Sequence, residues 1–243
     1  MVAERRAAFY ALAPGSWRDY WTLLHPPYTV WHLSYVMMGA AIAPHVDERR
    51  LAATMLAFFL GVGVAAHALD ELHGRPLATR VPQRPLLAIA FAGALGSVGL
   101  GVLGAAVVSW WLLAFVGFGA AILVAYNLEW AGGRFHTDAW FALAWGGFPV
   151  LTSYFAQTGT ITLPVLLMGA ACVLLSLGQR RLSTPVRLLR RRGVRCEGRL
   201  ILDDGTEISL SLDSLRAVPE GALRAHWLGL ALLAGGLAAW RMV

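Results

Sequence analysis

The stretch HALDELHGRPLATRVPQRPL, from His67 to Leu86, joins two long apolar segments of the chain. It contains two histidines, an Asp-Glu pair and three arginines. Ionisable side chains at the edge of a bilayer are costly, so a cluster this dense predicts a functional site. The apolar segments beside it decide the fold class, because each is long enough to cross hydrocarbon as a helix.

Composition extends this prediction to the whole chain. Of the 243 residues, 58% are hydrophobic and only 14% are charged, which is typical of an integral membrane protein. We expect an all-α, polytopic helical bundle with about seven spans, each close to the roughly 17 to 25 residues that a membrane helix needs. The predicted spans lie near residues 28–44, 51–68, 86–103, 107–127, 139–156, 161–177 and 225–240.

Arginine predicts the orientation of this bundle. With the N-terminus inside, 17 arginines lie on the cytoplasmic side and only Arg49, Arg50 and Arg241 lie outside. The positive-inside rule therefore favours a multi-pass protein of the cytoplasmic (inner) membrane with a cytoplasmic N-terminus. The net charge of +6 also predicts anionic lipid or an anionic substrate as a partner, and no motif supports nucleic-acid binding.

The chain contains no lysine. This absence excludes Schiff-base chemistry with retinal or pyridoxal phosphate, and it excludes the phosphate loop that needs Gly-Lys-Ser/Thr. The two cysteines, Cys172 and Cys196, suggest neither a disulfide nor a thiolate metal site.

A short polar insert interrupts the bundle before its last helix. Apolar residues alternate with polar ones on both sides of Asp203-Asp204-Gly205, which predicts a β-hairpin. We therefore divide the chain into a transmembrane bundle (1–192), a cytoplasmic hairpin insert (193–224) and a C-terminal transmembrane helix (225–243). Two strands alone are marginal in water, so the hairpin is expected to lie on the cytoplasmic mouth or on a protein partner.

Two cytoplasmic loops carry the candidate site residues. His67, Asp70 and Glu71 share one helical face and are predicted to be catalytic and to bind one cation. Magnesium suits carboxylates facing a diphosphate, and arginine adds bidentate contacts to phosphate. The predicted diphosphate-binding residues are Arg75, Arg80, Arg84, Tyr126, Asn127, Arg180, Arg181 and Arg187. Further candidates for the polar site are His73, Glu129, His136 and Asp138.

These residues resemble the UbiA superfamily of intramembrane prenyltransferases, especially the branch that prenylates 1,4-dihydroxy-2-naphthoate. That family places an Asn-Asp-x-x-Asp type motif at the end of its second helix, followed by R-x-x-x-R-P-L. Here the segment from His67 to Glu71 occupies the first motif, and Arg80-Val-Pro-Gln-Arg84-Pro-Leu reproduces the second. The segment 138–159 is similar to that branch's fifth helix, and the resemblance covers roughly residues 26–192.

The chain departs from this family at two places. The family's second aspartate-rich motif corresponds to residues 178–187, which contain no carboxylate and carry Arg180, Arg181 and Arg187 instead. The first motif has His67 in place of asparagine and lacks its last aspartate. Seven predicted spans also fall short of the family's usual nine.

The resemblance implies a membrane prenyltransferase that handles an isoprenoid diphosphate with Mg²⁺ at a cytoplasmic-side site and transfers the prenyl group to a small acceptor. Aromatic walls such as Trp31, Tyr35, Trp140 or Trp145 would shield the allylic cation. Two alternatives stay open. One is a metal enzyme that uses the mixed histidine and carboxylate set on a lipid. The other is a non-catalytic protein of the same scaffold that binds a prenyl lipid, or a protein partner through its hairpin.

Overall fold

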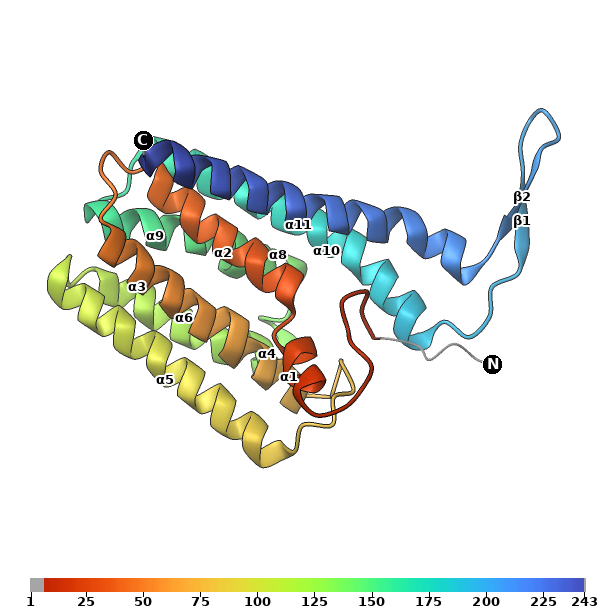
Figure 1. Ribbon diagram of the computed structural model, residues 1–243, viewed down its shortest axis with the longest axis horizontal. Helices are drawn as coiled ribbons and strands as arrows, with labels where there is room; N and C mark the ends of the chain where they lie inside the picture. Colours follow the sequence, from red (N-terminus) through yellow and green to blue (C-terminus); the bar gives the residue numbers. More distant parts are fainter. Residues whose placement is uncertain (1–6, 243) are drawn as a thin grey trace.

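The computed structural model describes residues 7–242, which are mostly helical (Figure 1). Two strands, β1 (Gly198–Ile201) and β2 (Glu207–Leu210), form the one sheet of these residues. The prediction of an all-α protein with a small hairpin is confirmed. Arg5 and Arg6, counted above as cytoplasmic, lie outside the described residues. The helices are α1 (Trp17–Leu23), α2 (Pro26–Ala41), α3 (Glu48–Phe58), η1 (Phe59–Ala66), α4 (His67–Leu72), α5 (Gln83–Val107), α6 (Leu112–Asn127), α7 (Trp130–Gly133), α8 (Asp138–Ala142), η2 (Leu143–Gly147), α9 (Phe148–Thr158), α10 (Leu163–Arg192) and α11 (Leu212–Met242).

Four helical stretches of the described chain are long and apolar enough to cross a membrane. They are Glu48–Leu72, which combines α3, η1 and α4, then Gln83–Val107, Leu163–Arg192 and Leu212–Arg241. The apolar helix α6 is shorter. Each of the seven predicted segments falls largely on helical structure, and the number of membrane crossings stays a prediction. The length and the apolar composition of these four helices are those expected of a membrane protein.

Local sequence signals explain where several helices begin and end. Asp47 caps α3, because its Oδ1 accepts hydrogen bonds from the backbone N–H groups of Arg49 and Arg50 at 2.9 and 3.0 Å. These bonds favour the carboxylate and lower the pKa of Asp47. Thr137 caps α8 by accepting from the N–H of Trp140 at 3.2 Å. Gly159 caps the C-terminus of α9, and its φ of 67° is the left-handed conformation that glycine adopts readily.

The helix α2 occupies the middle of the bundle, packed against α9, α11 and α3 (Figure 1). Its Trp31 and Tyr35 are among the largest fully buried side chains, and the indole N–H of Trp31 donates to the Tyr35 hydroxyl at 2.6 Å. A Cβ on Gly39 would collide with the backbone of Val150. Glycine at this position therefore sets the close approach of α2 and α9.

Two helical stretches each contain a wide, π-helical turn. One is η1, between α3 and α4, and the other is η2, between α8 and α9. Residues of both π-helices and of α6 form one apolar cluster, which includes Ala65, Ile122 and Trp145. A Cβ on Gly146 of η2 would lie 2.7 Å from the carbonyl oxygen of Cys172, so η2 also packs closely on α10. π-Helical turns are frequent at functional sites, and these two flank the candidate site.

The hairpin forms where the alternation predicted it. Its strands are antiparallel, pairing Gly198 with Leu210 and Ile201 with Glu207. Gly205 has a φ of 83°, and Asp204 Oδ1 accepts from the backbone N–H of Thr206 at 2.8 Å. The hairpin projects beyond the ends of α10 and α11, away from the bundle (Figure 1).

The helix α11 begins at Leu212, well before the predicted start at residue 225. Ser211 and Ser214 explain this start, because each hydroxyl accepts a hydrogen bond from the other's backbone N–H, at 3.0 and 2.8 Å. The added turns pack against α10 through Glu220, which binds Arg190 through two guanidinium nitrogens at 2.9 and 2.6 Å. Residues 212–224 therefore belong to the last helix, and the polar insert is correspondingly shorter.

Candidate functional site

A cavity of about 470 Å³, which we call the polar chamber, collects ionisable side chains at one end of the bundle. It lies between the start of α2, the helix α4, the junction of α6 and α7, and the second half of α10, and the segment 7–10 also lines it. That N-terminal segment runs between α1 and α10 (Figure 1). The polar lining residues are Tyr10, His25, Tyr28, His32, His67, Asp70, His73, Tyr126, Asn127, Glu129, His136, Gln179, Arg180, Ser183, Arg187, Arg190, Arg191 and Arg192.

Arginines of α10 give the polar chamber its positive charge. Two of them are neutralised locally: Arg180 pairs with Asp138 at 2.7 Å, and Arg190 pairs with Glu220 at 2.6 Å. Within the described chain, Arg187 and Arg191 form no ion pair with a carboxylate, and Arg187 reaches only the Thr184 hydroxyl at 3.4 Å. Two guanidinium groups are thus available to an anion, and guanidinium is the side chain best suited to phosphate oxygens.

Asp70 is the carboxylate that the bundle places in this basic environment. It lies on α4 among the lining residues, and its carboxylate makes no hydrogen bond or ion pair with any residue that the structure describes. Glu129 also lines the chamber, with His73 Nε2 and His136 Nδ1 each 3.9 Å from its carboxylate oxygens. That distance is too long for a hydrogen bond, so both carboxylates retain free acceptor capacity.

Glu71 lies outside the polar chamber and has a structural role. Its side chain is fully buried, and its carboxylate accepts from the backbone N–H groups of Leu77 and Thr79 at 2.9 and 2.8 Å. The Thr79 hydroxyl donates to the same carboxylate at 2.8 Å. Glu71 therefore holds the loop after α4 against the helix, whereas the sequence predicted that its carboxylate would bind a cation.

The predicted metal triad is consequently not assembled. His67 lines the chamber, but its Nδ1 bonds to the Gly63 carbonyl at 3.1 Å, and Glu71 is bound to the loop. No three histidine, cysteine, aspartate or glutamate side chains within the described chain come together as metal ligands. Adjacent residues of a helix point about 100° apart, so Asp70 can face the chamber while Glu71 faces the loop.

The remaining predicted residues divide between the polar chamber and its surroundings. Tyr126, Asn127, His73, Glu129, His136, Arg180 and Arg187 line it. Asp138 does not, but it holds Arg180. Arg75 donates to the carbonyl oxygens of Thr79 and Val81, at 3.3 and 2.6 Å, and so stabilises the loop. Arg80, Arg84 and Arg181 are exposed and lie outside the chamber.

Aromatic side chains pack against one another in the wall of the polar chamber. Tyr126 lies against His136 and Trp145, with ring centroids 4.4 and 4.6 Å apart, and Phe141 stacks on Trp145 at 5.7 Å. Of the four aromatic residues predicted to shield a cation, Trp145 lines the chamber. Trp31 and Tyr35 belong to the core cluster around α2.

Tyr10, His25, Gln179 and Arg191 line the chamber but were not predicted from the sequence. The Tyr10 hydroxyl lies 2.6 Å from His25 Nδ1, and the ring of His25 stacks on that of His67 with centroids 4.1 Å apart. Burial raises the pKa of Tyr10 well above its usual value, and burial together with nearby His67 lowers the pKa of His25 well below its usual value. Both groups are therefore neutral at pH 7. No pattern in the sequence signals this contact, because it depends on the N-terminal segment folding back.

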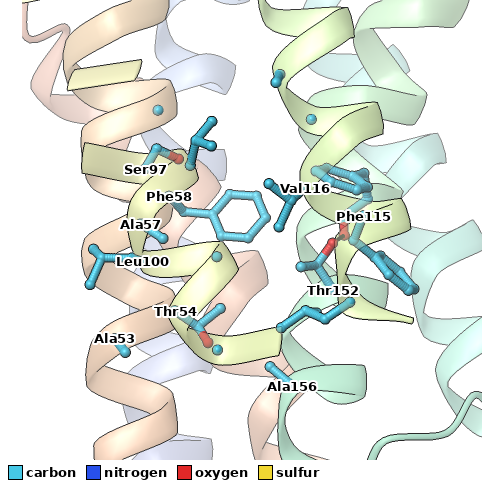
Figure 2. Close-up of a pocket in the computed structure, with 18 of the residues that line it drawn as sticks. Ala53, Thr54, Ala57, Phe58, Ser97, Leu100, Phe115, Val116, Thr152 and Ala156 are labelled. Carbon is cyan, nitrogen blue, oxygen red and sulfur yellow. Dashed lines mark hydrogen bonds between the residues drawn. The ribbon is translucent and has the colours of Figure 1, made fainter. Parts of the chain in front are cut away.

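A second cavity, which we call the apolar groove, adjoins the polar chamber. It measures about 450 Å³ and lies between α3, η1, α5, α6 and α9. Figure 2 shows its wall, in which Phe58 and Val116 point toward one another across the space beside Leu100 and Thr152. Trp145 lines both cavities. A polar site and an apolar site therefore meet at one side chain.

The chain matches no protein family, no curated protein and no solved structure.

Proposed function

We propose that the protein is a membrane prenyltransferase that binds the diphosphate of an isoprenoid in the polar chamber and transfers the prenyl group to a small acceptor. One observation carries the proposal: a basic chamber with unpaired arginines meets an apolar groove at Trp145. A prenyl diphosphate has the same division between an anionic head and an apolar tail. The partial resemblance of residues 26–192 to UbiA proteins supports the same chemistry.

The membrane placement is part of the proposal. Seven helical segments would span the cytoplasmic membrane with the N-terminus inside, in keeping with the arginine distribution. The polar chamber lies at the end that carries Arg187 and Arg191, so it would open toward the cytoplasm, where a water-soluble acceptor can enter. The apolar groove would then lie at the depth of the hydrocarbon, where a prenyl tail is stable.

Arg187 and Arg191 are the residues that we assign to the phosphate oxygens. Each guanidinium can donate two parallel N–H groups to one phosphate. A magnesium ion shared with a diphosphate commonly uses only one or two carboxylates, and the free carboxylate of Asp70 fits that role. Such an ion would supply charge neutralisation to the leaving diphosphate.

The transfer begins when the C1–O bond of the prenyl diphosphate breaks and its electron pair leaves with the diphosphate. The resulting allylic cation would lie near Trp145 and Tyr126, whose ring faces stabilise positive charge. A nucleophilic atom of the acceptor then bonds to C1 and releases a proton. Glu129 and His136, which line the same chamber without strong hydrogen bonds to one another, are placed to accept that proton.

The test uses the detergent-solubilised full chain and a panel of radiolabelled prenyl diphosphates, with and without magnesium. Arg187→Ala should weaken binding by about tenfold or more, because a hydrogen-bonded charge contact is lost. Arg181→Ala is the matched control, since it removes an exposed arginine of the same helix that does not line the chamber. Equal binding by both variants would contradict the placement of the head group. Failure of the unchanged protein to bind or cleave any prenyl diphosphate would overturn the proposal.

The non-catalytic alternative predicts a different result in the same experiment. A protein that only stores or senses a prenyl lipid would bind the diphosphate and depend on Arg187, but it would release no diphosphate over time. Arg187 and Arg191, which form no ion pair with a carboxylate within the described chain, favour binding in both cases. Turnover therefore separates the two functions.

A further inference from the structure

His25 is held in an unusual position at the start of α2. Its backbone lies in the left-handed region, with φ 46° and ψ 55°, which is uncommon for a residue other than glycine. Its side chain is 9% exposed, stacks on His67 and forms part of the wall of the polar chamber. A strained backbone conformation is often retained at a site where the side chain has a function.

Tyr10 determines which nitrogen of this imidazole carries the proton. The Tyr10 hydroxyl has His25 Nδ1 as its hydrogen-bond partner at 2.6 Å, and no other acceptor is recorded for it within the described chain. A buried hydroxyl donates its proton where an acceptor exists. The Tyr10 O–H therefore donates to Nδ1, and the hydrogen of the neutral ring lies on Nε2.

That Nε2–H group has no hydrogen-bond partner among the described residues, although it is buried. An unsatisfied buried donor costs free energy, so an acceptor that arrives with a ligand would be stabilising. His25, Arg187 and Arg191 all line the polar chamber, so the imidazole and both guanidinium groups surround the same cavity. An anion bound by these arginines would lie within the surroundings of His25.

We propose that His25 is a phosphate-binding residue, whose Nε2–H donates a hydrogen bond to a non-bridging phosphate oxygen of the ligand in the polar chamber. Tyr10 acts as a positioning residue, because it holds the required tautomer. The inference rests on the proposed function, since the ligand is the same diphosphate. It adds a neutral donor from α2 to the cationic donors of α10, so that the head group is held from two sides.

The experiment measures the binding of inorganic pyrophosphate and of farnesyl diphosphate to the solubilised full chain by calorimetry. His25→Phe keeps an aromatic ring and removes both nitrogens, and it should weaken both ligands by about tenfold or more. His25→Gln places an amide N–H near the position of Nε2 and should recover most of the affinity. Tyr10→Phe should weaken binding less, because only the tautomer preference is lost. His45→Phe, in an exposed loop away from the chamber, is the control.

A spectroscopic measurement separates a direct contact from a structural effect. In the protein labelled with ¹⁵N-histidine, the Nε2–H signal that His25→Gln removes should shift when pyrophosphate is added. If the unchanged protein and His25→Phe bind pyrophosphate equally well and Arg187→Ala does not bind it, the inference is wrong and the proposed function stands. If the unchanged protein binds neither ligand, both fall. If His25→Phe lowers the thermal stability, the ¹⁵N signal of the unchanged protein decides instead. Failure of that signal to shift when pyrophosphate is added would overturn the inference.

Discussion

Asp70 and Glu71 are neighbours in the chain but have different roles in the structure. Glu71 is fully buried and accepts three hydrogen bonds from Leu77 and Thr79, whereas the carboxylate of Asp70 lines the polar chamber without a partner among the described residues. The helix turns by about 100° between them. One carboxylate therefore stabilises a loop, and the other is available for chemistry.

Replacing each of these two carboxylates by its amide should separate stability from binding. Glu71→Gln turns part of the acceptor into a donor that faces two backbone N–H groups, so we expect a loss of about 1 to 3 kcal/mol in the free energy of unfolding. Asp70→Asn breaks no recorded hydrogen bond and should leave thermal stability nearly unchanged, while it alters magnesium-dependent binding. Thermal unfolding in detergent measures the first effect. Equal stability of both variants would contradict the role of Glu71.

The contact between α2 and α9 at Gly39 is expected to tolerate no added methyl group. Gly39→Ala would drive a Cβ into the backbone of Val150, and we expect a destabilisation of about 1 to 3 kcal/mol as α2 and α9 move apart. Gly117→Ala on α6 is the matched control, because no atom lies within 4 Å of the added carbon. The control should be neutral or slightly stabilising, since alanine favours helix more than glycine. Thermal unfolding of the two variants side by side measures the difference.

At the scale of elements, α10 and α11 extend far beyond their apolar segments and are joined there by ion pairs. Glu220, which is 7% exposed, binds Arg190 and also Arg224, the latter at 2.9 Å. The Arg224 guanidinium also lies over the Phe9 ring, 5.1 Å from its centroid. This cluster connects the two long helices to the N-terminal segment that lines the polar chamber.

Breaking this connection should loosen one end of the bundle. Glu220→Ala leaves the largely buried guanidinium of Arg190 without this carboxylate, and removing one partner of such a pair costs roughly 3 to 5 kcal/mol. We expect a lower unfolding temperature and faster hydrogen exchange in residues 212–224. Asp213→Ala, which removes an exposed partner of Arg216, is the control and should change little. Unchanged exchange in Glu220→Ala would show that apolar packing alone holds the extension.

At the scale of the whole molecule, two cavities of opposite character meet at Trp145, and five arginines of α10 line the polar one. The apolar groove needs α3, α5, α6 and α9, and the polar chamber needs α2, α4, α6 and α10. No single helix contains either site. The proposed function therefore depends on the arrangement of the entire bundle in the membrane.

The two cysteines allow this arrangement to be tested. Cys172 is fully buried, whereas Cys196 precedes the hairpin and is partly exposed. A membrane-impermeant maleimide should label Cys196 in inside-out vesicles and leave it unlabelled in right-side-out vesicles. In a Cys196→Ser background, His45→Cys should show the opposite pattern, since its loop lies at the other end of α2. Labelling of both sites from one side would contradict the predicted topology.

The amino-acid sequence by itself determined the helical class, the positions of the apolar helices and the hairpin, because these follow from local composition and turn residues. It also indicated the polar segment from His67 onward. Only the tertiary structure decided that Asp70 faces the chamber while Glu71 holds a loop, and that Arg187 and Arg191 are unpaired while Arg190 is bound to Glu220. It alone brought Tyr10 to His25. These outcomes depend on how loops and helices fold against one another, and such contacts leave no periodic pattern in the sequence.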